Sequence, residues 1–436
     1  MNKRQYQPRI LTSVEKIFSV IMLFFTTNAV LPLFLGEADP YSPPQIRPTQ
    51  LAITVALYSV AFYFMAIGWR KVIQNARDIK WIVALVSIAI ASMVWSQDPS
   101  LTLRRSALLL ATTMLGVYFG TRYTVPQQLR LLAWTFSLVI ACSFFFAIFL
   151  PKYGIDQDQH LGAWQGVFLY KNWLAKAMVL AMSVFLFVRP RRFPSLRWLG
   201  VAASLALLFL SRSATGMVVC AGIITIIAVY RLIGGRDAVV IPFIAVGLLL
   251  VAWPQLQNFT VAEVLQLVGR TPDLTGRTDL WSALLLAISK RPLLGYGFNG
   301  FWLGMRGESA SVLLATGLAS GHNGFVDVML ELGGLGLVTF VAGYLVFWQR
   351  ALGFLSRVPG PVPAWLCMYL VFMLLYNLTE SSLLAQNSIY WVLYTSTAVS
   401  LSAGSFRQLC NNLNGQSLNP WVVAVKMQGP HGGRNA

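Results

Sequence analysis

Long apolar runs alternate with short polar segments along most of the chain. Each run reaches or approaches the ~20 residues that an α-helix needs to cross a bilayer. We count twelve such runs: 14–35, 51–69, 81–95, 106–120, 131–150, 166–188, 198–210, 214–230, 238–253, 322–348, 364–376 and 387–401. The pattern predicts an all-α polytopic membrane protein with twelve transmembrane helices.

The composition favours the same interpretation. Of the 436 residues, 56% are hydrophobic and only 11% are charged. A water-soluble domain carries about 25% charged residues, so this chain has too few charges to cover a surface in water. We expect residues 1–436 to form a single integral membrane domain.

The net charge of +18 at first suggests a nucleic-acid partner. However, most Lys and Arg residues fall on alternate loops, and these loops contain few acidic residues, namely Glu15, Asp78 and Asp237. Positive charge on the cytoplasmic loops orients membrane proteins. The distribution therefore argues against nucleic acid and places both termini in the cytoplasm.

Two segments differ from the short loops. The outer segment 254–321 is long enough to carry function, and its residues 278–290 have apolar side chains at helical spacing. These side chains, Leu280, Trp281, Leu284, Leu285 and Ile288, predict an amphipathic helix lying on the bilayer surface. The tail 402–436 is rich in Asn, Gly and Gln and is expected to be disordered in the cytoplasm.

Polar residues collect at the outer ends of several spans. The tenth run opens with His322 and Asn323, and Asp327 and Glu331 follow at helical spacing. Basic residues also lie on this side, against the charge bias: Arg104, Arg105, Arg212, Arg277 and, inside the sixth run, Lys171 and Lys176. Such a collection suits an anionic lipid head such as a diphosphate, which guanidinium groups bind through paired hydrogen bonds.

Each candidate has a structural alternative. His322 could cap a helix, and Arg212 could extend to the interface without a partner. On a straight helix Glu331 faces nearly opposite His322, which favours a structural role. Asp156 and Asp158 form an Asp-x-Asp motif, which metal-dependent transferases use, so a metal site there stays an alternative.

Several motifs occur in a specific order: Gly-Val-Phe-Leu-Tyr-Lys-Asn at 166–172, Ser-Arg-Ser-Ala-Thr-Gly at 211–216, Gly-Arg-Thr-Asp-Leu-Trp at 276–281, Pro-Leu-Leu-Gly-Tyr-Gly at 292–297, and His-Asn-Gly-Phe to Glu-Leu-Gly over 322–333. With this succession the chain resembles the superfamily of O-antigen ligases and Wzy-type polysaccharide polymerases. The similarity covers nearly the whole chain, and the sequence is most similar to the exopolysaccharide-production, ExoQ-like branch.

The resemblance implies a GT-C-like, inverting glycosyltransferase of the bacterial inner membrane that needs no metal or other cofactor. It implies a donor glycan on undecaprenyl diphosphate, a large periplasmic loop at 254–321 and an active site facing the periplasm. Arg212 and Arg277 correspond to the diphosphate-binding residues and His322 to the catalytic base. Supporting roles are possible for Lys171, Arg104, Arg105, Asn323 and Glu331.

The acceptor is left open by the sequence. A polymerase extends the next lipid-linked repeat, whereas a ligase transfers the glycan to the lipid A core. The resemblance favours the polymerase. A flippase or transporter of lipid-linked sugars is an alternative of another class, although the chain lacks an internal repeat of six spans.

Overall fold

The computed structural model describes residues 9–29, 54–56, 58–60, 62–63, 77–157, 160–190, 194–233, 240, 244, 275–358 and 360–402. For residues 9–12, 77 and 275–279 it describes the backbone only. The second and ninth apolar runs lie mostly outside these residues. The loop segment 254–274 and the tail beyond residue 402 lie outside them entirely.

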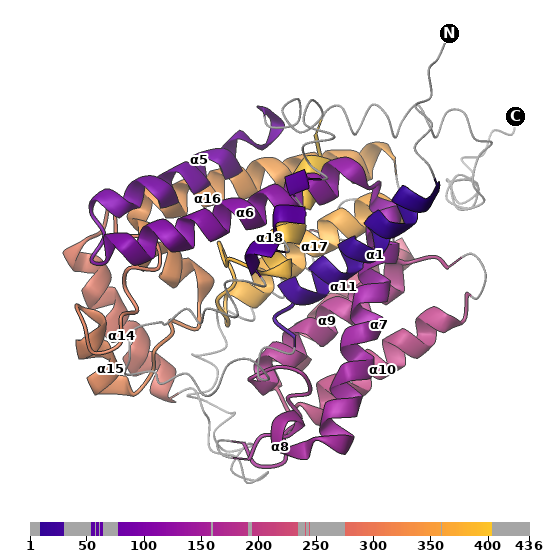
Figure 1. Ribbon diagram of the computed structural model, residues 1–436, viewed down its shortest axis with the longest axis horizontal. Helices are drawn as coiled ribbons and strands as arrows, with labels where there is room; N and C mark the ends of the chain where they lie inside the picture. Colours follow the sequence, from indigo (N-terminus) through magenta and orange to yellow (C-terminus); the bar gives the residue numbers. More distant parts are fainter. Residues whose placement is uncertain are drawn as a thin grey trace, which may run out of the picture.

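The described part of the chain is all-α (Figure 1). Its α-helices are α1 (Arg9–Thr26), α5 (Lys80–Ala91), α6 (Pro99–Arg122), α7 (Val125–Phe149), α8 (Pro151–Gly154), α9 (Lys171–Phe187), α10 (Leu196–Leu210), α11 (Ala214–Ile233), α14 (Thr275–Lys290), α15 (Ser309–Thr316), α16 (Gly324–Arg357), α17 (Pro361–Asn377) and α18 (Ile389–Ser400). Two short 3-10 helices, Arg77–Ile79 and Ser92–Val94, flank α5.

The apolar runs that lie within the described residues form helices, as predicted. Among the described residues, α7, α11 and α16 are long and apolar enough to cross a membrane, and shorter apolar helices accompany them. The all-α fold with membrane-spanning helices is thus supported, whereas the count of twelve spans stays a prediction. The predicted start of the sixth helix is wrong: α9 begins at Lys171 because Gly166, with a φ of +59°, lies in a turn.

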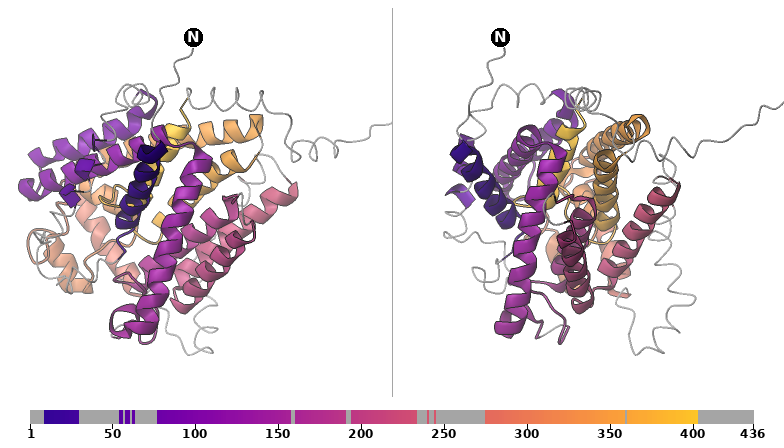
Figure 2. Two further views of the ribbon diagram at one scale, coloured as in Figure 1. Left: turned by 45° about the vertical axis from the view of Figure 1, so that its right-hand side comes forward. Right: turned by 90° about the vertical axis from the view of Figure 1, so that its right-hand side faces the viewer.

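Close helix packing places the elements around the site. α5, α6 and α16 lie side by side, and α1 lies along α7 (Figures 1 and 2). Gly116 and Gly120 let α18 approach α6: a Cβ at Gly116 would lie 2.7 Å from the Val392 carbonyl oxygen, and one at Gly120 2.9 Å from that of Ser396. Small residues four apart allow this approach between membrane helices.

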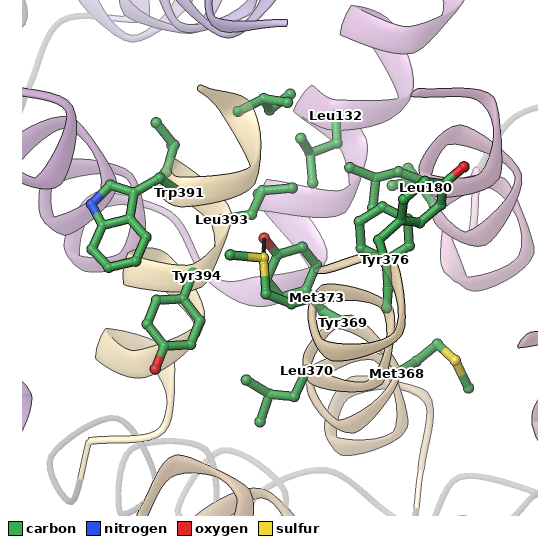
Figure 3. Packing of buried hydrophobic residues seen from close by; sticks show 14 of the residues in the cluster. Leu132, Leu180, Met368, Tyr369, Leu370, Met373, Tyr376, Trp391, Leu393 and Tyr394 are labelled. Atoms are coloured by element: carbon green, nitrogen blue, oxygen red, sulfur yellow. Dashed lines mark hydrogen bonds between the residues drawn. The ribbon is translucent and has the colours of Figure 1, made fainter. Parts of the chain in front are cut away.

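α17 lies at the centre of the core. Its residues from Ala364 to Met373 are all buried, as expected for a helix that is apolar on every side. Figure 3 shows Tyr369, Met373 and Tyr376 of this helix among side chains from α9 and α18. The end of α17 and the loop that follows it are thereby held in a fixed position.

α16 is interrupted at Gly333, where φ is +63° and ψ −164°. The turn 292–297 replaces the hydrogen bonds that the interruption removes. The N–H groups of Gly334 and Leu335 donate to the carbonyls of Pro292 (2.8 Å) and Leu293 (3.1 Å), and the carbonyls of Leu330 and Glu331 accept from Tyr296 (2.8 Å) and Gly297 (2.9 Å). Backbone hydrogen bonds therefore join the motif at 292–297 to the helix segment around Gly333.

A helix is present where the sequence predicts one in the long loop, namely α14 (Thr275–Lys290). Leu280 and Leu284 are fully buried and pack against protein, in a cluster with Tyr296 and Phe301. Leu285 is 61% exposed, so it remains available for contact with lipid. The location of α14 on the bilayer surface stays a prediction.

Candidate functional site

His322 directly precedes α16 and does not cap it. Asn323 is the cap, since its side-chain oxygen accepts hydrogen bonds from the backbone N–H groups of Phe325 (3.0 Å) and Val326 (3.3 Å). His322 has a φ of +46°, a conformation that is uncommon outside glycine and often found at functional sites. The alternative of a helix-capping histidine is therefore wrong.

The imidazole of His322 faces Glu380, in the loop between α17 and α18. Its Nδ1 lies 3.9 Å from Oε2 of Glu380. This nitrogen is buried and, among the described residues, makes no hydrogen bond within the fold. The distance is too long for a hydrogen bond but lets the carboxylate stabilise a protonated imidazole.

Glu380 also connects His322 to the starts of two other helices. The side-chain amide of Asn172, at the start of α9, donates to Oε1 of Glu380 at 3.1 Å. The hydroxyl of Ser213, just before α11, donates to Oδ1 of Asn172 at 2.9 Å. We call these four residues, Ser213, Asn172, Glu380 and His322, the His322 network.

Arg212 is the residue directly before Ser213. It lies in the turn between α10 and α11 with a φ of +51°, and its side chain is exposed. Its Nη1 donates weakly to the carbonyl of Leu161 at 3.4 Å. Arg212 thus adjoins the His322 network along the chain, and its exposed guanidinium group keeps donors available for an anionic ligand.

Arg277 lies in the first turn of α14, and its side chain is outside the described residues. One turn later in this helix, Nε1 of Trp281 donates to the carbonyl of Gly321 at 3.0 Å. Gly321 is the neighbour of His322. The backbone of α14 therefore brings Arg277 towards the region of His322.

The buried Lys176 lies one turn after Asn172 in α9. Its Nζ lies 4.4 Å from the ring centre of Tyr390 and 5.3 Å from that of Tyr376. Such contacts stabilise a cation away from water. The charge of Lys176 also interacts with that of Glu380. Glu380 thus supplies the opposite charge that a buried lysine needs.

The other candidate residues differ in their surroundings. Lys171 begins α9 and is half-buried, whereas Arg104 is exposed near Asp98. Hydrogen bonds from the Leu101 N–H and the Ser100 hydroxyl hold the pKa of Asp98 below its ordinary value. Arg104 is thus placed as a surface charge. Arg105, half-buried on α6, interacts electrostatically with Glu331.

The straight-helix argument about Glu331 does not apply to His322, because His322 lies before the helix and has a left-handed backbone. Asp327 interacts electrostatically with both His322 and Glu331.

The described residues contain no group of three or more His, Cys, Asp or Glu that could hold a metal ion, and Asp158 is outside them.

Sequence reasoning did not single out Glu380 or Ser213 as site residues. Ser213 and Asn172 belong to motifs that were recognised, so their place in a site could have been suspected. Glu380 stands in the short segment Thr-Glu-Ser-Ser at 379–382, whose only signal is an acid in an outer loop. Its partners become visible only when the helices pack together.

Comparison with known proteins confirms the resemblance. A family model described as O-antigen ligase matches residues 199–341, which include Arg212, Arg277 and His322. The exopolysaccharide production protein ExoQ of Rhizobium meliloti (strain 1021) is 25% identical over 301 residues, covering 65% of this chain and 68% of that protein.

Proposed function

We propose that the protein is a membrane glycosyltransferase. It transfers an oligosaccharide from undecaprenyl diphosphate to an acceptor hydroxyl at the periplasmic face of the bacterial inner membrane. The His322 network carries this proposal, because it joins a potential base to Glu380 and to two other motifs that are far apart in the sequence. Arg212 directly precedes Ser213 of this network. The similarity to the O-antigen ligase family supports the proposal.

The network suits an inverting displacement. Neutral His322 accepts the proton of the acceptor hydroxyl while that oxygen attacks the anomeric carbon. The bond between this carbon and the diphosphate oxygen breaks on the opposite face, so the configuration inverts. Glu380 stabilises the imidazolium, and Arg212 and Arg277 stabilise the charge on the departing diphosphate. No step requires a metal ion.

Polymerisation is the preferred reaction. The name of the rhizobial relative assigns it to exopolysaccharide production, which favours a lipid-linked repeat as the acceptor. The family description, O-antigen ligase, favours a second candidate in which the glycan passes to the lipid A core. Both reactions use the same donor chemistry and differ in the acceptor.

Purified protein in liposomes distinguishes these functions. With lipid-linked oligosaccharide alone, a polymerase lengthens the glycan. With core lipid added, a ligase transfers the glycan to it. A flippase only moves the unchanged oligosaccharide across the bilayer, and this outcome in both assays would refute the proposal. A His322→Ala preparation serves as the inactive control.

A further inference from the structure

A second polar cluster lies beside the His322 network and joins α6 to α16. The charge of Arg105 on α6 acts on the carboxylate of Glu331 on α16. This carboxylate accepts a hydrogen bond from the backbone N–H of Asn299. The side-chain amide of Gln386 donates to Oδ1 of Asn299 at 3.2 Å. We call Arg105, Asn299, Glu331 and Gln386 the Arg105 cluster.

Asp327 connects the Arg105 cluster to His322. It lies one helical turn before Glu331, and its charge acts on both Glu331 and His322. Its carboxylate accepts hydrogen bonds from Nε1 of Trp302 (3.2 Å) and from the hydroxyl of Ser381. His322 therefore interacts with two acids. Glu380 connects it to Asn172 and Ser213, and Asp327 connects it to Glu331 and so to the Arg105 cluster.

Polar groups around the cluster have unused hydrogen-bonding capacity. In the part of the chain that the structure describes, Nε of Arg105 and Oδ1 of Asn387 are buried without a hydrogen-bond partner. Asn387 follows Gln386, and its N–H donates at 2.9 Å to the hydroxyl of Thr112, which is on α6 with Arg105. Buried polar groups in proteins normally form hydrogen bonds, so a bound ligand is expected to supply the partners of these two atoms.

We propose that the Arg105 cluster binds the acceptor, and that its ligand is an uncharged sugar residue carrying the attacking hydroxyl. This inference rests on the proposed transferase function. Sugar hydroxyls both donate and accept hydrogen bonds. The cluster offers a matching mixture of guanidinium and amide donors with carboxylate and amide acceptors. Asp327 interacts with both Glu331 and His322 and so links the cluster to the proposed base.

The charges of the cluster argue for a neutral sugar over a phosphorylated one. The charge of Arg105 interacts with Glu331, and the second acid, Asp327, interacts with Glu331. A phosphate placed there would meet two acidic groups whose ionised forms repel it, whereas a neutral sugar can hydrogen-bond to either form. The diphosphate of the donor is instead attracted to the exposed Arg212.

Acceptor kinetics test the proposal. The probe is the oligosaccharide released from its lipid diphosphate by mild acid, which keeps the non-reducing end that supplies the hydroxyl. Glu331→Gln and Gln386→Leu are expected to raise the KM for this probe about tenfold, with a smaller effect on kcat and unchanged affinity for undecaprenyl diphosphate. Lys152→Gln, an exposed cation of α8 outside the cluster, is the matched control.

Other outcomes overturn it. An unchanged KM in both variants would show that the cluster does not bind the acceptor. Parallel losses of thermal stability and of affinity for undecaprenyl diphosphate would show that it only holds α6 to α16. If the wild type transfers nothing, the proposed function fails. Direct binding of the released oligosaccharide, weaker in Glu331→Gln, would then still support a sugar site, and equal binding would refute it.

Discussion

His322 and Glu380 approach each other to 3.9 Å across two loops, one before α16 and one after α17. Asn172 donates to Glu380, and Asn323 caps the helix that follows His322. Asn323 also donates to the carbonyl of Leu378 at 3.2 Å, which ties the two loops together. The pair is therefore held by three helices and is suited to a defined proton transfer.

Substitutions in this pair should affect catalysis more than donor binding. We expect His322→Ala to lower the transfer rate by about 10² to 10⁴ with little change in affinity for undecaprenyl diphosphate. Glu380→Gln should cause a smaller loss in kcat, because the imidazole remains but its protonated form loses a stabilising charge. Glu308→Gln removes a carboxylate that pairs with Lys290 and serves as the control. Near-normal turnover in folded His322→Ala would exclude His322 as the base.

Substitutions of the arginines should weaken donor binding as well. Loss of a charged hydrogen-bonding group from the diphosphate is expected to reduce affinity about 10- to 100-fold in Arg212→Gln and Arg277→Gln. Lys should restore little of it at a site that needs paired hydrogen bonds. Binding of undecaprenyl diphosphate measures this effect, with Arg130→Gln, at an exposed position in the second turn of α7, as the control. Unchanged affinity would assign the diphosphate to other residues.

Chelation should leave the activity intact. In the proposed mechanism arginines stabilise the leaving diphosphate, so transfer in liposomes is expected to continue in EDTA. A loss of transfer that Mg²⁺ or Mn²⁺ restores would contradict this mechanism and favour a metal site at Asp156 and Asp158.

The interruption of α16 predicts a sharp difference between two glycines of this helix. A Cβ at Gly333 would lie 2.3 Å from the carbonyl carbon of Leu293, and φ is +63°. We expect Gly333→Ala to lower the free energy of unfolding by about 2 kcal/mol or more. Gly353→Ala, in the same helix with nothing within 4 Å of the added Cβ, should be neutral or slightly stabilising. Thermal unfolding in detergent measures both, and equal stabilities would contradict the structure of the turn.

Reporter fusions test the topology. A fusion after Gly317, where a side chain would meet open space, should place alkaline phosphatase in the periplasm and make it active. A fusion after Gly360, between α16 and α17 and equally open, should leave it inactive in the cytoplasm. The reverse pattern would refute the orientation and, with it, the periplasmic location of the site.

Sequence patterns predicted the helices well because membrane helices depend on runs of apolar residues. They also suggested His322 and Arg212 as candidates, because polar side chains stand out at the ends of such runs. They did not identify Glu380, whose pairing with His322 depends on how α9, α16 and α17 pack. The helical-wheel argument about Glu331 assumed that His322 belongs to the helix, whereas His322 precedes the cap and has a left-handed backbone.

The interruption of α16 at Gly333 also bears on where this helix enters the bilayer. Its 34 residues would span about 51 Å if unbroken, well beyond the ~30 Å of hydrocarbon. The segment after the interruption, 335–357, is about 34 Å long and matches that thickness. We expect the first segment, with Asp327 and Glu331, to lie at the depth of the lipid headgroups. At that depth water and sugar hydroxyls would reach His322, while the polyprenyl chain of a bound donor would stay in the acyl layer.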